Sequence, residues 1–262
     1  KVGRIHAVEK LNFDLYRGET LSFVGESGCG KSTTGRSLLY LNTPGSGKIL
    51  FEGKEIRPNR SDDLSNLRRN VQMVFQDPFS ALNPKQRIGF ILSEPLLCHR
   101  LATPAEALKK AEYLLERVGL EPRMISRFPH EFSGGQRQRI CIARALMLDP
   151  KVVVADEAVS SLDVSVKSQV VDLLLDLQKE RQLSYLFISH DMAIVEKVSH
   201  RIAVMYLGEI VEIGPSDEVI GNPSHPYTQQ LMAAVPVPDP LKNRHRIIGA
   251  PPTELPSPIR SL

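Results

Sequence analysis

Short, continuous apolar runs recur along the chain and predict buried β-strands. The clearest are Thr20–Val24, Val71–Phe75, Lys151–Ala155 and Tyr185–Ile188. Unbroken apolar runs rich in β-branched residues are typical of parallel strands that are covered on both faces. Segments with helical periodicity separate these runs, so the order of elements predicts an α/β fold.

Other segments alternate between apolar and polar side chains. Residues 5–15 do so, whereas Arg201–Val211 is a mostly apolar run with a bend at Gly208. A period of two favours strands with one buried face. We therefore expect a strand over 5–15 and an antiparallel hairpin at the edge of the sheet over Arg201–Val211. Lys48–Phe51, which follows a turn, should be a further short strand.

Residues 77–150 have a different pattern, in which helical periodicity replaces the strand-like runs. Thr103 and Pro104 are suited to begin a helix whose apolar face is Ala107, Ala111, Leu114, Leu115 and Val118. We predict a catalytic core formed by residues 1–76 and 151–222, with 77–150 as a mostly helical insert subdomain. Prolines recur after Gly221, which favours a surface extension over 223–262.

Composition narrows the class of protein. Of 262 residues, 42% are hydrophobic and 24% are charged, as in ordinary globular proteins. The formal net charge of +3 is too small to indicate a nucleic-acid partner. No apolar run is long enough to cross a membrane. The three scattered cysteines have no metal-ligand spacing, which is typical of a reducing compartment.

A phosphate-binding motif follows the first predicted strand. Its residues are Gly25, Glu26, Ser27, Gly28, Cys29, Gly30, Lys31 and Ser32, followed by Thr33 in a predicted helix over Thr33–Leu41. The glycines allow backbone N–H groups to surround phosphate oxygens at a helix N-terminus. Lys31 adds a positive charge and the Ser32 hydroxyl can ligate Mg²⁺. The alternative, a glycine-rich turn without function, does not explain the strand–loop–helix context.

Two further segments suit the same chemistry. Asp156 and Glu157 end a buried strand, where the first can hold Mg²⁺ and the second can accept a proton from water. Ser133, Gly134, Gly135 and Gln136 precede a predicted helix over Arg137–Leu146 and provide a second N-terminus able to face phosphate. The alternatives are a strand that simply meets solvent and a flexible helix start.

The motif order is similar to that of the ATP-binding-cassette (ABC) ATPases, the nucleotide-binding subunits of ABC transporters. It comprises Gly25–Ser32, Gln76, Ser133–Gln136, Asp156–Glu157, Ser161–Asp163 and His190. The resemblance covers nearly the whole chain. It implies an α/β P-loop NTPase fold with a RecA-like core, an antiparallel β edge and a helical subdomain. It also implies ATP and Mg²⁺ as cofactors.

The resemblance also assigns roles to residues. It implies that Glu157, His190 and Gln76 are catalytic and that Ser32, Gln76 and Asp156 surround the metal. ATP would contact Gly25–Thr33 in one subunit and Ser133–Gln136 and Asp163 in the opposite subunit. From its sequence context alone, His190 could instead be an ordinary histidine at a strand end. Asp163 is also placed to cap a helix carrying Val166, Val170, Leu173, Leu174 and Leu177 on one face.

A narrower resemblance is to the ATPases of dipeptide, oligopeptide and glutathione importers. It rests on Ile140–Leu146, Ala155–Ser160, Tyr206–Gly208 and His225–Thr228. It implies transmembrane permease partners, a homodimer or a heterodimer with a sister ATPase domain, and an indirect link to a periplasmic substrate-binding protein. The location would be the cytoplasmic face of the bacterial inner membrane. The chain departs from the family at Ala158, where proline is usual, and in lacking an adenine-stacking aromatic near or before residue 3.

Two other functions fit the same nucleotide motifs. One is a soluble ABC-type ATPase that acts on nucleic acid or ribosomes, although the chain lacks the basic arms and coiled-coil inserts of those proteins. The other is a nucleotide-gated binding module without turnover, against which Glu157 and His190 argue. We expect an importer ATPase without a nucleic-acid partner.

Overall fold

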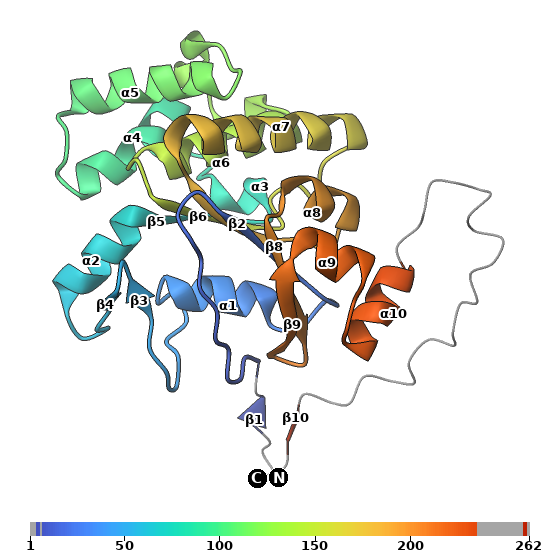
Figure 1. Cartoon of the computed structure of the whole chain (residues 1–262). Helices are drawn as coiled ribbons and strands as arrows, with labels where there is room; N and C mark the ends of the chain where they lie inside the picture. The colour runs from blue at the N-terminus through green and yellow to red at the C-terminus, as the bar shows by residue number, and fades with distance from the viewer. Residues whose placement is uncertain (1–3, 6, 235–258, 261–262) are drawn as a thin grey trace.

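A mixed six-stranded sheet forms the centre of the molecule (Figure 1). The computed structural model describes residues 4–5, 7–234 and 259–260. The strand order is β5 (Val71–Val74), β6 (Val152–Asp156), β7 (Ser184–Ile188), β2 (Thr20–Val24), β8 (Arg201–Tyr206) and β9 (Glu209–Pro215). All neighbours are parallel except β8 and β9, which form the antiparallel hairpin at the edge. The predicted α/β class, its buried strands and its antiparallel edge are therefore confirmed.

The two faces of the sheet carry separate hydrophobic cores, because successive side chains of a strand point to opposite faces. In β6, Val153 and Ala155 belong to one core and Val154 belongs to the other. The first core is covered by α4 (Ile88–Cys98), α5 (Pro104–Arg117), α6 (Gly134–Leu146) and α7 (Val164–Arg181). The second is covered by α1 (Lys31–Leu38), α2 (Ser61–Asn70) and the hairpin of β3 (Leu50–Phe51) and β4 (Lys54–Glu55).

All elements between Pro78 and Leu146 in the described chain are helical. They include α3 (Pro78–Ala81) and the 3₁₀ turns Pro122–Ser126 and Pro129–Glu131. Thr103 caps α5 as predicted, through a reciprocal pair of hydrogen bonds with Glu106. The predicted apolar face of α5 is fully buried. The division of the chain into a core, a helical subdomain and an extension stays a prediction.

The remaining elements surround the hairpin edge. They are α8 (Met192–Val198), α9 (Ser216–Gly221) and α10 (Pro226–Ala234), which share a third small core with β8. The short strands β1 (Arg4–Ile5) and β10 (Ile259–Arg260) pair with each other. None of the helices in the described ranges has the length and apolar content needed to span a bilayer.

The strand predicted over 5–15 is wrong for the described part of that range beyond Ile5. From Ala7 to Leu15 the chain forms no ladder. The alternation instead reflects packing: Leu11, Phe13 and Leu15 lie against the second core, and the ring centroids of Phe13 and Phe23 are 4.9 Å apart. A period of two thus indicated a half-buried segment that is not part of a strand ladder.

Three helix boundaries differ from the predictions. Helix α1 begins at Lys31 rather than Thr33 and ends at Leu38 rather than Leu41. Helix α6 begins at Gly134 rather than Arg137, so Gly134 and Gly135 of Ser133–Gln136, called here the signature segment, lie in its first turn. Within the predicted proline-rich extension, Pro226–Ala234 is a helix that begins at a proline, a position where the missing N–H costs nothing. Residues 235–258 and 261–262 of that extension, and the expected adenine-stacking position, lie outside the described residues.

Candidate functional site

The loop Gly25–Gly30 joins the carboxyl end of β2 to α1 and is pressed against neighbouring backbone. A Cβ on Gly25 would lie 2.2 Å from the carbonyl oxygen of Met205, and one on Gly30 would lie 2.2 Å from that of Ala7. Both glycines also have positive φ, at 144° and 108°. Only glycine fits either position. Ser27 and Gly28, between them, form the exposed tip.

The Lys31 side chain lies under this loop and is only 5% exposed. Its ammonium donates to the carbonyl oxygens of Gly25 at 2.7 Å and Glu26 at 2.8 Å, and also contacts Cys29 Sγ at 3.6 Å. The positive charge is therefore held against two backbone carbonyl oxygens of the loop. A buried cation beside backbone N–H groups at a helix N-terminus is an arrangement that favours phosphate.

Ser32 and Asp156 form the second part of the site. The Ser32 hydroxyl donates to Asp156 Oδ1 at 2.7 Å across 124 residues of sequence. Asp156 is 1% exposed, and this burial raises the pKa of its carboxyl, while the Ser32 hydrogen bond and the charges of Arg36 and Lys31 oppose the rise. A hydroxyl and a carboxylate side by side are oxygen ligands of the kind that Mg²⁺ prefers.

The Ser32 hydroxyl and the Asp156 carboxylate suit a Mg²⁺ ion that is bound together with phosphates. Mg²⁺ is usually held in nucleotide sites by one or two protein oxygens, with phosphate and water completing the octahedron. In keeping with this, no group of three or more metal-binding side chains occurs in the described part of the chain. Ser32 and Asp156 are the residues that would hold the ion, with Gln76 close to the neighbouring Glu157.

Three predicted catalytic residues converge at Glu157. Gln76 Nε2 donates to Glu157 Oε2 at 2.7 Å, and His190 Nδ1 lies 3.5 Å from Glu157 Oε1. They come from the carboxyl ends of β5, β6 and β7, which meet at one edge because these strands are parallel. The His190 side chain is 59% exposed and that of Glu157 is 17% exposed. The carboxylate is thus open to water but held by an amide and an imidazole.

The backbone at Glu157 is unusual. Its φ is 47°, in the left-handed region that residues with side chains seldom adopt. The amide of Glu157 donates to Ile188 O at 2.9 Å, which ties the turn to the end of β7. Strained backbone of this kind is concentrated at functional sites, and here it turns Glu157 away from the strand direction that Asp156 follows.

The Ser133–Gln136 segment lies apart from this site. Ser133 caps α6: its hydroxyl accepts from the Gln136 amide at 3.3 Å, and Gln136 Oε1 accepts from the Ser133 amide at 3.0 Å. Helix α6 belongs to the first core, whereas α1 belongs to the second. No hydrogen bond or ion pair between described residues joins Ser133–Gln136 to Gly25–Thr33. The structure does not bring the two predicted phosphate-facing segments together within one chain.

Asp163 lies at the N-terminus of α7, as predicted, but its side chain makes no capping hydrogen bond. It is exposed, and the neighbouring Val164 is 84% exposed. Gly135 connects this region to the signature segment, because a Cβ there would lie 2.5 Å from Val166 Cγ1. Ser133–Gln136 and Asp163 therefore lie on one surface formed by the starts of α6 and α7.

Sequence reasoning missed several residues that hold the phosphate loop. The hydroxyl of Tyr227 in α10 accepts from the Glu26 amide at 3.1 Å, and the Gly208 amide donates to Cys29 O at 3.0 Å. Both residues lie in segments singled out for family resemblance, Tyr206–Gly208 and His225–Thr228. Their contacts with the loop are non-local, so no local pattern marked them.

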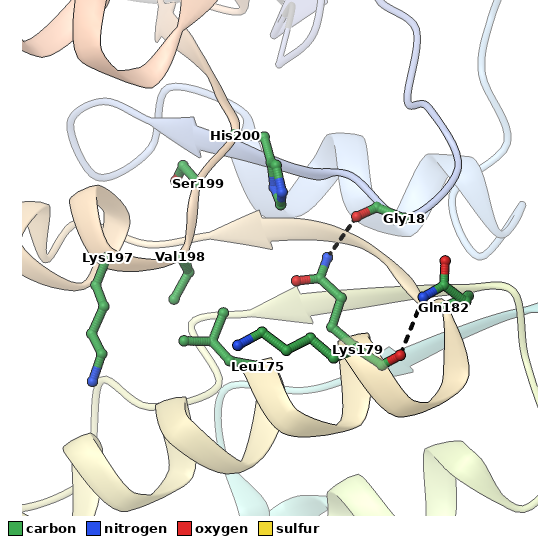
Figure 2. A pocket seen from close by; sticks show the side chains of 9 residues that line it. Gly18, Leu175, Lys179, Gln182, Lys197, Val198, Ser199 and His200 are labelled. Atoms are coloured by element: carbon green, nitrogen blue, oxygen red, sulfur yellow. Dashed lines mark hydrogen bonds between the residues drawn. The ribbon is translucent and has the colours of Figure 1, made fainter.

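A cavity of about 390 Å³ lies elsewhere in the molecule (Figure 2). Gly18, which precedes β2, and His200, which precedes β8, line it together with Lys179, Gln182 and Lys197. It is therefore at the amino ends of these strands, whereas the phosphate loop leaves the carboxyl end of β2. None of the predicted site residues lines this cavity, so we do not place the nucleotide there.

Comparison with known proteins gives two family matches. Residues 8–160 match the family described as ABC transporter, and residues 211–259 match the C-terminal region of oligopeptide and dipeptide transporters. The chain is 56% identical over 260 residues to the glutathione import ATP-binding protein GsiA of Pectobacterium atrosepticum, and 60% identical over 242 residues to that of Salmonella typhimurium. These matches cover 99% and 92% of the chain but only 41% and 39% of the two relatives.

Solved structures confirm the fold. The chain resembles cbiO1 from Clostridium perfringens, part of the ABC transporter complex cbiONQ, with a TM-score of 0.74 and 30% identity over 82% of this chain and 84% of that one. It also resembles a dimeric post-hydrolysis state of the ATP-binding cassette MJ0796 bound to ADP and phosphate. That match has a TM-score of 0.73 and 28% identity and covers 82% of this chain and 94% of the other. The family resemblance expected from the motifs is therefore confirmed.

Proposed function

The chain belongs to the ABC transporter family of ATP-binding proteins, and from that premise we propose that it hydrolyses ATP to drive the import of small peptides. The observation that carries the proposal is the contact of Gln76 and His190 with Glu157, next to the Ser32–Asp156 pair. A water-activating carboxylate, Glu157, directly follows one of the two candidate metal ligands, Asp156, and this arrangement suits hydrolysis of a nucleoside triphosphate.

We propose the following roles within one chain. Lys31 and the loop amides bind the β- and γ-phosphates. Ser32 and Asp156 would hold Mg²⁺ together with ATP, and the ion would neutralise phosphate charge. Glu157 accepts a proton from water while the water oxygen bonds to the γ-phosphorus and the bond to the bridging oxygen breaks. Gln76 orients that water and the Glu157 carboxylate, and His190 donates a hydrogen bond to a γ-phosphate oxygen.

The signature segment acts on a second copy. Ser133–Gln136 and the exposed Asp163 lie away from the phosphate loop of their own chain and share a surface. Two ATPase domains packed head to tail would place this surface over the opposite γ-phosphate, so that ATP joins the two and hydrolysis releases them. The dimeric form of the similar cassette MJ0796 supports this arrangement. The second copy is an identical chain or a sister ATPase domain.

The proposed partners come from the relatives. The importer-type relatives act in glutathione import, and the C-terminal region matches peptide transporters. We infer that the chain docks on transmembrane permease subunits at the cytoplasmic face of the inner membrane. A periplasmic substrate-binding protein would deliver dipeptides, oligopeptides or glutathione to that permease.

Phosphate release tests the proposal. The purified chain should release phosphate from ATP in Mg²⁺ and stop when the metal is chelated. Hydrophobic permease subunits should co-purify with it from membranes, and nucleic acid should not. Co-purification with nucleic acid or ribosomes, with no permease, would contradict the import function. ATP binding without phosphate release, even when permease is present, would contradict hydrolysis.

A further inference from the structure

A tyrosine on α10 contacts the phosphate loop from 201 residues away in sequence. Tyr227 is 9% exposed, and its hydroxyl oxygen accepts a hydrogen bond of 3.1 Å from the amide of Glu26. The carbonyl oxygen of the same residue, Glu26, accepts from the Lys31 ammonium at 2.8 Å. One residue of the loop thus connects the C-terminal helix to the lysine that binds phosphate.

The β8–β9 hairpin supports the same side of the loop. The rings of Tyr206 and Tyr227 lie 4.4 Å apart, centroid to centroid, at 39°. The Gly208 amide donates to Cys29 O at 3.0 Å, and Met205 O lies against Gly25. The loop is therefore held at its beginning, at Glu26 and at Cys29 by residues from β8, the hairpin turn and α10.

The position of Tyr227 is itself fixed. The two carboxylate oxygens of Glu212, on β9, accept from the amides of Ser224 and His225 at 2.8 and 2.9 Å. His225 Nδ1 then accepts from the Tyr227 amide at 3.2 Å. These bonds anchor the start of α10 to the sheet edge, so that the tyrosine ring cannot easily move without the hairpin. Burial raises the pKa of Tyr227 to about 12, which keeps its hydroxyl neutral.

We propose that Tyr227 is a positioning residue for nucleotide binding. It sets the orientation of the Gly25–Glu26 peptide group, whose carbonyl oxygen accepts from Lys31 at 2.7 Å, and so the place of the Lys31 ammonium. This gives a role to the C-terminal peptide-transporter region: α10 tunes the affinity of the loop for the triphosphate. The inference rests on the proposed function, because it assumes that Gly25–Ser32 binds ATP. The alternative is that Tyr227 only packs in the third core, a role for which its ring would be sufficient without its hydroxyl.

The experiment compares Tyr227→Phe with Tyr206→Phe. Both remove one hydroxyl and keep the ring, but within the described part of the chain only the Tyr227 hydroxyl is hydrogen-bonded to the loop. Loss of one hydrogen bond of about 1 kcal/mol predicts roughly fivefold weaker binding of a fluorescent ATP analogue in Tyr227→Phe. Tyr206→Phe should bind as the wild type does. The rate at saturating ATP should stay unchanged in both, so the effect appears in KM and not in kcat.

A second measurement keeps the test independent of folding. Without nucleotide, the Glu26 amide should exchange its hydrogen faster in Tyr227→Phe than in the wild type. The two proteins should have the same midpoint of thermal unfolding. Equal affinities in wild type and Tyr227→Phe, or an equal loss in Tyr206→Phe, would overturn the inference while leaving the proposed function intact. Failure of the wild type to bind the analogue would instead contradict the proposed function.

Discussion

The phosphate loop and the signature segment are both glycine-bearing helix starts, but they are held in opposite ways. The loop is fixed by distant elements: Asp156 holds Ser32, Tyr227 holds Glu26, and Lys31 is buried. The signature segment is capped mainly by itself, through Ser133 and Gln136, and Ser133 is exposed. The first is organised for a ligand inside its own chain, and the second presents its helix N-terminus outward.

The largest effect should come from Glu157→Gln. The amide cannot accept the proton of the attacking water, so hydrolysis should fall on the order of 10²–10⁴-fold while ATP binding is retained. Phosphate release and analogue binding measure the two properties. Glu218→Gln, which changes an exposed carboxylate on α9, should match the wild type. Undiminished turnover in Glu157→Gln would show that another group is the base.

Lys31→Ala should weaken nucleotide binding itself. Losing a charged hydrogen-bond donor predicts affinity lower by on the order of 10–100-fold. The control is Lys179→Ala, which removes a cation that lines the cavity in Figure 2. Analogue titrations should separate the two variants. A loss in Lys179→Ala with normal binding in Lys31→Ala would place the nucleotide in that cavity instead of the loop.

A smaller effect should distinguish the N-cap residues Ser133 and Thr103. Ser133→Ala and Thr103→Ala each remove an N-cap and should lower the free energy of unfolding by about 1 kcal/mol. Denaturant unfolding checks this. Only Ser133→Ala should also reduce hydrolysis, because Ser133 is assigned to the γ-phosphate of the opposite subunit. If both variants lose hydrolysis equally, the role of Ser133 is structural.

Local patterns predicted much of the fold. The strands β2, β5, β6 and β7 follow from continuous apolar runs, and Thr103–Pro104 marked the start of α5 because capping is a local interaction. The pattern over 5–15 predicted burial but not pairing, since alternation does not specify a partner strand. The proline content of this region argued against helix α10, although Pro226 is the first residue of that helix, where the missing N–H removes no helical hydrogen bond.

The sequence predicted the motif residues of the site but not the residues that support them. Motif order identified Lys31, Asp156 and Glu157, and the parallel strands then bring Gln76 and His190 to Glu157. The contact of Tyr227 with Glu26 was missed because it depends on how the C-terminal helix packs on the hairpin edge. That contact arises from tertiary structure, and neither residue carries a local signal for the other.

Mixing two inactive variants tests the central claim, that each copy completes the other's site. Lys31→Ala lacks the phosphate-binding lysine, and Ser133→Arg blocks the signature surface with a long charged side chain. A head-to-tail pair of the two contains one intact composite site, so the mixture should release phosphate clearly faster than the sum of the separate variants. A mixture equal to that sum, together with wild-type protein that hydrolyses ATP at full rate as a monomer, would contradict the account.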